Sequence, residues 1–351
     1  MAIRLCVTSS MILAFWGLLS CQPSAQTKPT AKGEQKLQSK TVELKGSWEQ
    51  DIKQKLQDLI SEKAKGSKTF SEAKPPVAVF DFDNTSIHGD IGRAFFDWMI
   101  LHQKFLFTDE LFNVLPEDKR EEIKKAWQEL QKLPKDKRAK SVELQKFRKY
   151  MHQAYWSLCH ETSPEKCYPW QVRFYAGYSP EQIRTMAQKV FEYELSRPLG
   201  SEPIKAGKDD PAPAITSTGI RINEEILDLM AILQDRGFQV WIVTAGPQWV
   251  VQGAAKRFNL DPKRIIGMRT VLKDGKLTTE MEPPPTFRKG KVQAIEKFIG
   301  YKPVLAVGDS WTDADMLEYA EHAILIDRGY EDLKKKAFDS GWWVQPTFAT
   351  R

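Results

Sequence analysis

The sequence has few of the residues that build zinc sites. It contains four cysteines and five histidines in 351 residues, and the histidines, at positions 88, 102, 152, 160 and 322, form no ligand-spaced cluster on a helix. This pattern argues against a zinc centre. The charge is also not of one sign, because 52 Lys and Arg are interleaved with 46 Asp and Glu, which leaves a formal charge of +6. We interpret this as a solvated surface and expect no nucleic-acid partner.

The start of the chain lacks a hydrophobic run long enough to cross a bilayer comfortably. The apolar stretch Met11–Leu19 follows a basic residue, Arg4, and polar sequence begins directly after it. Residues 1–20 are therefore predicted to be an export signal. The stretch ends in Leu-Leu-Ser-Cys21, which resembles the lipobox of bacterial lipoproteins. That resemblance implies cleavage before Cys21 and lipid attachment to it; an ordinary cleaved signal with a chance cysteine is the alternative.

The lipobox resemblance also implies a location. We expect a lipid-anchored protein of the bacterial cell envelope, periplasm-facing or at the outer membrane, and Gln22 favours the latter. The membrane is then a partner through the N-terminal lipid. Loss of the signal and lipidation of Cys21 leave only Cys159 and Cys167, which are separated by seven residues with a Ser-Pro turn signal. A disulfide between them is feasible in an oxidising compartment, and two unpaired cysteines are the alternative.

The remaining chain alternates strand and helix patterns around one long helical insertion. Residues 21–46 are poor in large apolar residues and are predicted to be a flexible tether. An amphipathic helix is expected at about 48–65. Short apolar runs typical of buried parallel strands occur at Val77–Phe80, Phe238–Val243, Pro303–Val307 and Ala323–Ile326, with helices expected at 222–235, 249–258 and 291–298 and an Asp-Gly hairpin at 271–277. This alternation predicts an α/β fold with a doubly wound parallel-sheet core, Rossmann-like, over 47–87 and 218–351, and an inserted all-helical domain over 88–217.

Polar residues follow three of the predicted strands, where an open α/β sheet binds its ligands. The first strand is followed by Asp81-Phe-Asp83-Asn-Thr85, the second by Thr244-Ala245-Gly246, and the third by Gly308-Asp309-Ser-Trp-Thr-Asp313. So many carboxylates in one pocket would be costly without a cation to neutralise them. Ligands that are all oxygen atoms indicate Mg²⁺.

These residues are similar to the motifs of a known superfamily. Asp81-x-Asp83-x-Thr85, Thr244, Lys289 and Gly308-Asp309-x-x-x-Asp313 resemble, in order, the four motifs of the haloacid dehalogenase superfamily, over about half the chain. The resemblance implies that Asp81 is the nucleophile and Asp83 the general acid and base. It also implies that Asp81, Asp83 through its carbonyl, and Asp309 hold Mg²⁺, with Asp313 in or near that site.

The same resemblance assigns the phosphate contacts. Thr244 and its neighbour Ala245 would bind phosphate oxygens, and Lys289 would neutralise charge on the phosphoryl group. Lys291 is the rival for this lysine role; Lys289 is preferred because the run Lys-Gly-Lys-Val matches the phosphoserine phosphatase branch with its first lysine in place. The inserted domain corresponds to a cap that closes over a small substrate.

Residues at the start of the insertion and its aromatic side chains suggest a substrate. The opening motif is similar to that of secreted phosphorylcholine phosphatases, in which an acidic residue follows, and Asp90 holds that place. Asp90 could contact a substrate ammonium or cap the first helix of the insertion. Aromatic faces attract quaternary ammonium groups, although core packing is the alternative for each ring. The aromatic candidates are Phe95, Phe96, Trp98, Tyr155, Trp156, Tyr168 and Trp170.

The function expected from the sequence is that of a Mg²⁺-dependent phosphomonoesterase acting on a small phosphorylated substrate, with phosphorylcholine as the leading hypothesis. A broad-specificity enzyme, or a phosphatase for phosphoserine or phosphoethanolamine, is the first alternative. A surface lipoprotein that only binds a ligand is the alternative from another class.

Overall fold

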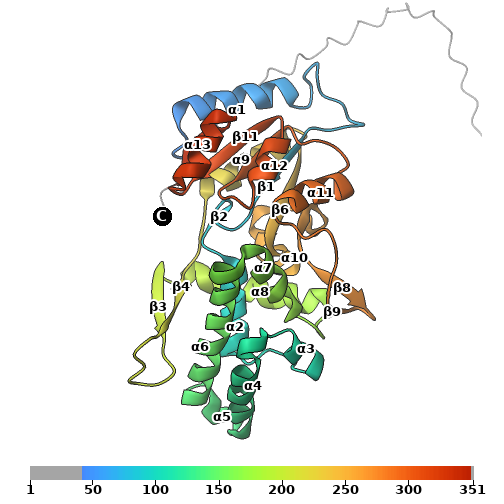
Figure 1. The fold of residues 1–351 in the computed structure, drawn as a ribbon. Coiled ribbons are helices and arrows are strands. Elements are labelled where there is room, and N and C mark those ends of the chain that lie inside the picture. Colours follow the sequence, from blue (N-terminus) through green and yellow to red (C-terminus); the bar gives the residue numbers. More distant parts are fainter. Residues whose placement is uncertain (1–41, 349–351) are drawn as a thin grey trace, which may run out of the picture. The chain divides into compact units, whose positions relative to one another are not determined.

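The core is a six-stranded parallel sheet. The computed structural model describes residues 42–348, and the strands lie in the order β12-β11-β10-β1-β6-β7 (Figure 1). All five neighbouring pairs are parallel, with β1 between β10 and β6. The predicted α/β fold with a doubly wound parallel sheet is thereby confirmed. The strands are β1 (Val77–Phe80), β6 (Gln239–Pro247), β7 (Ile265–Met268), β10 (Leu305–Gly308), β11 (His322–Asp327) and β12 (Trp343–Pro346).

Helices cover both faces of this sheet. Along β1, Ala78 and Phe80 belong to one hydrophobic core, whereas Val77 and Val79 belong to a second one, because successive side chains of a strand point to opposite faces. All four side chains are fully buried, which explains the continuous apolar run in the sequence. The core helices are α1 (Gln50–Lys63), α9 (Glu224–Asp235), α10 (Gln248–Ala254), η2 (Ala255–Phe258), η3 (Pro262–Arg264), α11 (Lys289–Phe298), α12 (Ala314–Tyr319) and α13 (Glu331–Asp339).

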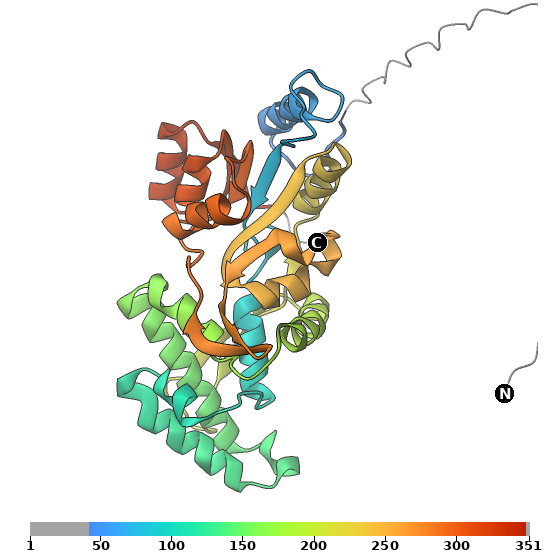
Figure 2. The same ribbon diagram turned by 90° about the vertical axis from the view of Figure 1, so that its right-hand side faces the viewer.

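The long insertion supplies most of a helical cap. In both ribbon views its helices α2 to α7 gather at the end of the core that is away from α1 (Figures 1 and 2). Helix α2 packs against α6 and also against α8 and α10, and α8 packs against α10, so the first and last helices of the insertion connect cap to core. The helices are α2 (Ile91–Leu101), α3 (Asp109–Asn113), α4 (Glu117–Lys132), α5 (Lys135–Arg138), α6 (Val142–Ser157), the π-helical turn η1 (Leu158–Thr162), α7 (Pro164–Arg173) and α8 (Pro180–Ser196).

The prediction of an all-helical insertion was wrong at its end. Residues 88–217 include β3 (Gly200–Ile204) and most of its antiparallel partner β4 (Ala214–Thr218). The loop between them is held by Asp210, whose carboxylate accepts hydrogen bonds from the amides of Ala206 and Ala212 and forms an ion pair with Lys149 of α6 at 2.7 Å. A tertiary ion pair therefore supports a hairpin whose own sequence is weakly strand-like.

Two further short antiparallel pairs complete the described chain. β2 (Ile87–His88) pairs with β5 (Arg221–Ile222), directly after the first motif, and β8 (Thr270–Lys273) pairs with β9 (Lys276–Met281). The second pair is the predicted hairpin, and Asp274 and Gly275 both have the positive φ that its turn requires.

The packed part of the chain begins before the predicted end of the tether. Val42 and Leu44 are buried, and the carbonyl of Val42 accepts a hydrogen bond from Gln57 of α1. The predicted signal at 1–20, lipidation of Cys21 and most of the 21–46 tether lie outside the described residues. Among residues 42–348, no helix combines the length and the apolar character needed to cross a bilayer.

Candidate active site

The ends of three neighbouring strands bring the predicted motifs together. Asp81 follows β1, Asp309 follows β10, and Thr244 lies in the last part of β6. The register aligns these ends, because Phe80 is paired with Val307 on one side and with Ile242 on the other. Asp81, Thr244 and Asp309 are all buried at this edge. The predicted motifs therefore meet at the carboxyl edge of the parallel sheet, as the sequence indicates.

The lysine of the site is Lys291, so the preference for Lys289 was wrong. The Nζ atom of Lys291 lies 2.7 Å from Oδ1 of Asp81 and also contacts Oδ1 of Asp313, and the side chain has no exposed surface. Lys289 is exposed at the start of α11. Two residues of helix differ in direction by about 200°, so only one of these lysines can point at the sheet. Lys291 shares the buried side of α11 with Ala294 and Ile295, as the i+3 and i+4 spacing requires.

Asp313 orients its neighbours rather than standing free. Its Oδ2 accepts hydrogen bonds from the amides of Asp309 and Ser310, both at 3.1 Å, and its Oδ1 faces Lys291. A Cβ on Gly308 would lie 2.6 Å from the Cβ of Asp313, which explains why glycine precedes Asp309. Both oxygens of Asp313 are therefore occupied, and its role is to fix the loop that carries Asp309.

The carboxylates form an acidic cluster. Oxygen atoms of Asp81, Asp309 and Asp313 lie within 4.8 Å of one another. Burial and the charge of Asp313 raise the pKa of Asp309 to about 6, although Arg328 and Thr85 act against this. The hydroxyl group of Thr85 donates a hydrogen bond of 3.0 Å to Oδ1 of Asp309. The threonine of the first motif therefore helps to orient Asp309.

Asp83 lies beside the first turn of α2. Its Oδ1 accepts a hydrogen bond of 2.8 Å from the amide of Ile91. Burial raises the pKa of Asp83 well above its usual range, and the nearby charges of Asp90 and Asp81 raise it further, against the smaller effect of the Ile91 amide. A raised pKa favours the protonated carboxyl group, which is the form that can donate a proton.

Thr244 and Ala245 lie on β6, the strand next to β1. The hydroxyl oxygen of Thr244 accepts a hydrogen bond of 2.9 Å from the amide of Gly246, which leaves its own proton free to be donated. Both residues line the active-site cavity. The arrangement suits contact with a phosphate oxygen.

Asp90 takes one of the two roles that the sequence left open, that of a helix cap. It is the N-cap of α2, and its Oδ1 accepts a hydrogen bond of 2.8 Å from the amide of Arg93. It also lines the active-site cavity. The capping interaction uses one oxygen and leaves the other available to the cavity.

The active-site cavity lies between core and cap and has a volume of about 330 Å³. Of the cap aromatics, Tyr155 and Tyr168 line it, together with Trp311 and Tyr330 of the core. Phe95, Phe96 and Trp170 instead lie in the hydrophobic core, Trp98 packs against that core, and Trp156 is 56% exposed. Most of the aromatic candidates are therefore packing residues.

A disulfide joins Cys159 and Cys167, as the sequence allowed. The residues that follow these cysteines, His160 and Tyr168, both line the active-site cavity. The disulfide therefore ties together the two parts of the cap that border the site.

Arg328 is a site residue that sequence reasoning missed. Its Nη1 lies 2.8 Å from Oδ2 of Asp309, and its side chain lines the cavity. It follows the last residue of β11, so the rule applied to the other three strands would have found it.

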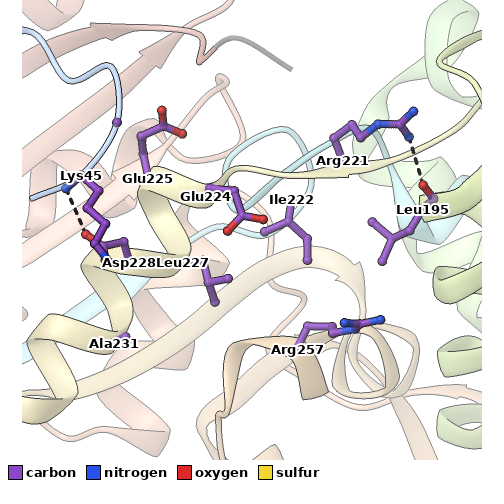
Figure 3. Close-up of a pocket in the computed structure, with 11 residues that line it drawn as sticks. Lys45, Leu195, Arg221, Ile222, Glu224, Glu225, Leu227, Asp228, Ala231 and Arg257 are labelled. Carbon is purple, nitrogen blue, oxygen red and sulfur yellow. Dashed lines mark hydrogen bonds and ion pairs between the residues drawn. The ribbon is translucent and has the colours of Figure 1, made fainter. Parts of the chain in front are cut away.

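Another cavity, of about 630 Å³, lies on the core and is lined by none of the predicted site residues (Figure 3). Several of its charged groups already have partners. Lys45 pairs with Asp228, Glu225 accepts hydrogen bonds from the amide and hydroxyl of Ser47, and Arg221 donates to the carbonyl of Leu195. We assign no chemistry to it.

Comparisons with known proteins find phosphatases among the relatives of this chain. The model of the haloacid dehalogenase-like hydrolase family matches residues 144–318. The chain is 24% identical over 269 residues to a phosphorylcholine phosphatase of Pseudomonas aeruginosa, an alignment that covers 68% of this chain and 69% of that protein. It is 32% identical over 127 residues to a phosphoserine phosphatase of Halobacterium salinarum, covering 35% of this chain and 60% of that protein.

A solved structure shares the fold. The crystal structure of a conserved protein of unknown function from Anaerococcus prevotii superposes with a TM-score of 0.73 at 22% identity, covering 86% of this chain and 93% of that one. The chain therefore contains a haloacid dehalogenase-like hydrolase domain with phosphatase relatives, and its enzyme class is that of the phosphoric monoester hydrolases.

Proposed function

We propose that the protein is a Mg²⁺-dependent phosphomonoesterase that forms an aspartyl-phosphate on Asp81. The observation that carries the proposal is the buried contact between Asp81 and Lys291 at the floor of a cavity bordered by Asp83, Thr244 and Asp309. A nucleophile, a cation, an acid and a hydroxyl donor thus meet at one sheet edge.

The donor set fits Mg²⁺. Asp81 and Asp309 supply carboxylate oxygens, and the carbonyl of Asp83 is the third candidate. Among residues 42–348, the group of possible metal ligands at this site contains no histidine or cysteine. Asp313, whose oxygens are already engaged, would orient Asp309 instead of binding directly. When bound, the ion would stabilise negative charge on the phosphoryl oxygens.

The reaction divides into two displacements. An oxygen of Asp81 forms a bond to phosphorus as the bond from phosphorus to the ester oxygen breaks, and Asp83 gives its proton to the departing oxygen. Asp83 then takes a proton from a water molecule whose oxygen attacks the phosphorus, releasing phosphate and restoring Asp81. Lys291 and the hydroxyl of Thr244 stabilise the charge of the transferring group.

Phosphorylcholine is the first candidate substrate. It is supported by the relative from Pseudomonas aeruginosa and by the four aromatic rings at the cavity. Cation–π attraction contributes about 0.5–2 kcal/mol for each ring that faces a quaternary ammonium. The free oxygen of Asp90 would add a counter-charge. Phosphoserine is the second candidate, supported by the relative from Halobacterium salinarum.

A panel of esters tests these proposals. Hydrolysis of p-nitrophenyl phosphate, phosphorylcholine, phosphoethanolamine and phosphoserine is measured with Mg²⁺, with EDTA, and with Asp81→Asn. We expect turnover that needs both Mg²⁺ and Asp81, and a lower KM for phosphorylcholine than for phosphoethanolamine. Turnover that survives Asp81→Asn would remove Asp81 from its role, and no turnover on any ester would favour a ligand-binding lipoprotein.

We propose separately that the protein is anchored to the bacterial cell envelope by lipid on Cys21. The lipobox resemblance supports this proposal. Labelling of expressing cells with a palmitate analogue should mark the wild-type protein, and Cys21→Ser should abolish both label and membrane fractionation. Label that persists in Cys21→Ser would contradict the assignment.

A further inference from the structure

A further cavity, lined by residues of the insertion, shares two lining residues with the active-site cavity. This side chamber has a volume of about 580 Å³ and is lined by residues that include Arg93, Trp156 and Ile215. Tyr155 and His160 line both cavities, so the same two rings border the reacting site and the side chamber. A substrate longer than the active-site cavity would meet the side chamber next.

Arg93 brings a positive charge into this chamber, and the carboxylates that act on it, Asp90 and Asp83, form no direct ion pair with it. It lies in the first turn of α2, two residues after Ile91, and both Asp90 and Ile91 belong to the active-site arrangement. Within residues 42–348, no carboxylate lies within ion-pair distance of its guanidinium, and its buried Nε has no hydrogen-bond partner. A buried donor without a partner is unfavourable, and more so when the group is charged, so a ligand that accepts its hydrogen bond would be stabilised here.

Other ionisable groups of the chamber are differently placed. His152 is hydrogen-bonded to Asp97 at 2.8 Å, and Glu161 accepts from Ser157. Asp118 is exposed to solvent. Burial lowers the pKa of Arg93, but the nearby Asp90 and Tyr155 more than offset this, so the guanidinium is charged at neutral pH.

We propose that the side chamber is a subsite for the leaving group and takes a second anionic group, a carboxylate or a phosphate, at the far end of the substrate. Arg93 would bind this anion through its fork of N–H donors, a geometry suited to both groups. The exposed faces of Trp156 and Ile215, 56% and 69% exposed, offer an apolar wall to the intervening carbon chain. The inference rests on the proposed phosphatase function and extends it.

The subsite separates substrates by the charge of their tail. Choline carries no anion, so phosphorylcholine would use the active-site cavity alone. An ester of a sugar acid would use both cavities. The matched pair 6-phosphogluconate and glucitol 6-phosphate isolates the effect, because both are open six-carbon esters that differ at the far end by a carboxylate against a hydroxyl group.

The test measures kcat and KM for this pair with wild type, Arg93→Gln and Arg93→Lys, with Lys335→Gln as a control that removes an exposed charge on α13. Wild type and Lys335→Gln should prefer the acid at least tenfold in kcat/KM. Arg93→Gln should reduce this preference to within about twofold, mainly through KM, and Arg93→Lys should restore part of it. Melting curves confirm that each variant is folded.

Binding to Asp81→Asn, followed by calorimetry, separates the two levels of the proposal. Tighter binding of the acid, lost when Arg93→Gln is added, supports the subsite even without turnover. Equal handling of the two esters by wild type, or a preference that survives Arg93→Gln, overturns the subsite. Failure to hydrolyse any ester, p-nitrophenyl phosphate included, counts against the phosphatase function and leaves the binding result to decide the subsite.

Discussion

Replacing Lys291 should nearly abolish catalysis, whereas replacing Lys289 should not. Lys291→Gln removes the cation that lies 2.7 Å from Asp81 and also contacts Asp313. Lys291 and Asp313 have no exposed side-chain surface and Asp81 has 7%, so solvent screens this contact little. Lys289→Gln alters an exposed side chain on the same helix and is the matched control.

The magnitude follows from burial. Breaking a buried ion pair by removing one partner costs about 3–5 kcal/mol, because the other charge stays buried. Lys291→Gln leaves two buried carboxylates without their cation, so we expect its loss of folding stability at the upper end of this range. Loss of one preorganised stabiliser of developing charge costs roughly 2.7–4 kcal/mol in the transition state, or about 10²–10³-fold in kcat.

The assay is hydrolysis of p-nitrophenyl phosphate at saturating Mg²⁺, with unfolding followed by circular dichroism to show that each variant is folded at the assay temperature. The kcat of Lys291→Gln should be at least about 100-fold lower than that of wild type, and the kcat of Lys289→Gln should stay within about twofold of wild type. Equal losses in both variants, or substantial turnover in Lys291→Gln, would refute the reasoning from burial.

Three further predictions concern the cap, a close backbone contact and the acid. The pKa of Asp97 is about 2, because its contacts with His152 and Arg148 outweigh the effect of burial. This depressed pKa stabilises the fold above about pH 4 by roughly 2 kcal/mol, which is lost as pH falls from about 4 to 2. Asp97→Asn should therefore lower the urea midpoint at pH 7 and flatten its decline in acid; an unchanged acid decline would contradict this. A Cβ on Gly290 would lie 1.7 Å from the carbonyl oxygen of Pro285, so Gly290→Ala should cost about 1–3 kcal/mol in chemical denaturation and reduce turnover, and wild-type behaviour would be evidence against this packing. Asp83→Asn should give a rapid burst of p-nitrophenol followed by slow turnover, because this leaving group needs little acid while water still needs a base; a slow first turnover in stopped-flow would argue against that role.

Motifs at strand ends could be predicted because they depend on short local patterns. Continuous apolar runs identified β1, β10 and β11, and parallel pairing then placed Asp81 and Asp309 side by side. The strands β7 and β12, which form the two edges of the sheet, were missed. Gly267 interrupts the apolar run of β7, and β12 is only partly buried and ends in proline.

Some of the missed features could have been found from the local sequence, and others could not. The buried side of α11 could have identified Lys291, because Ala294 and Ile295 follow it at helical spacing. The β3–β4 hairpin could not be predicted in this way, since its loop is fixed by Lys149, which lies 61 residues before Asp210. Cavity contacts such as those of Tyr155 depend on how the cap packs, which no local pattern encodes.

The cross-link between Cys159 and Cys167 matters for how this protein is prepared. His160 and Tyr168 flank it and border the cavity, whereas Asp81 and Lys291 belong to the core and do not depend on it. Protein made in a reducing cytoplasm should therefore keep its chemistry but lose the fixed spacing of these two side chains. The KM of such protein would reflect a cavity in which these two side chains are no longer held at a fixed spacing. Affinities measured on oxidised and reduced batches should therefore not be pooled.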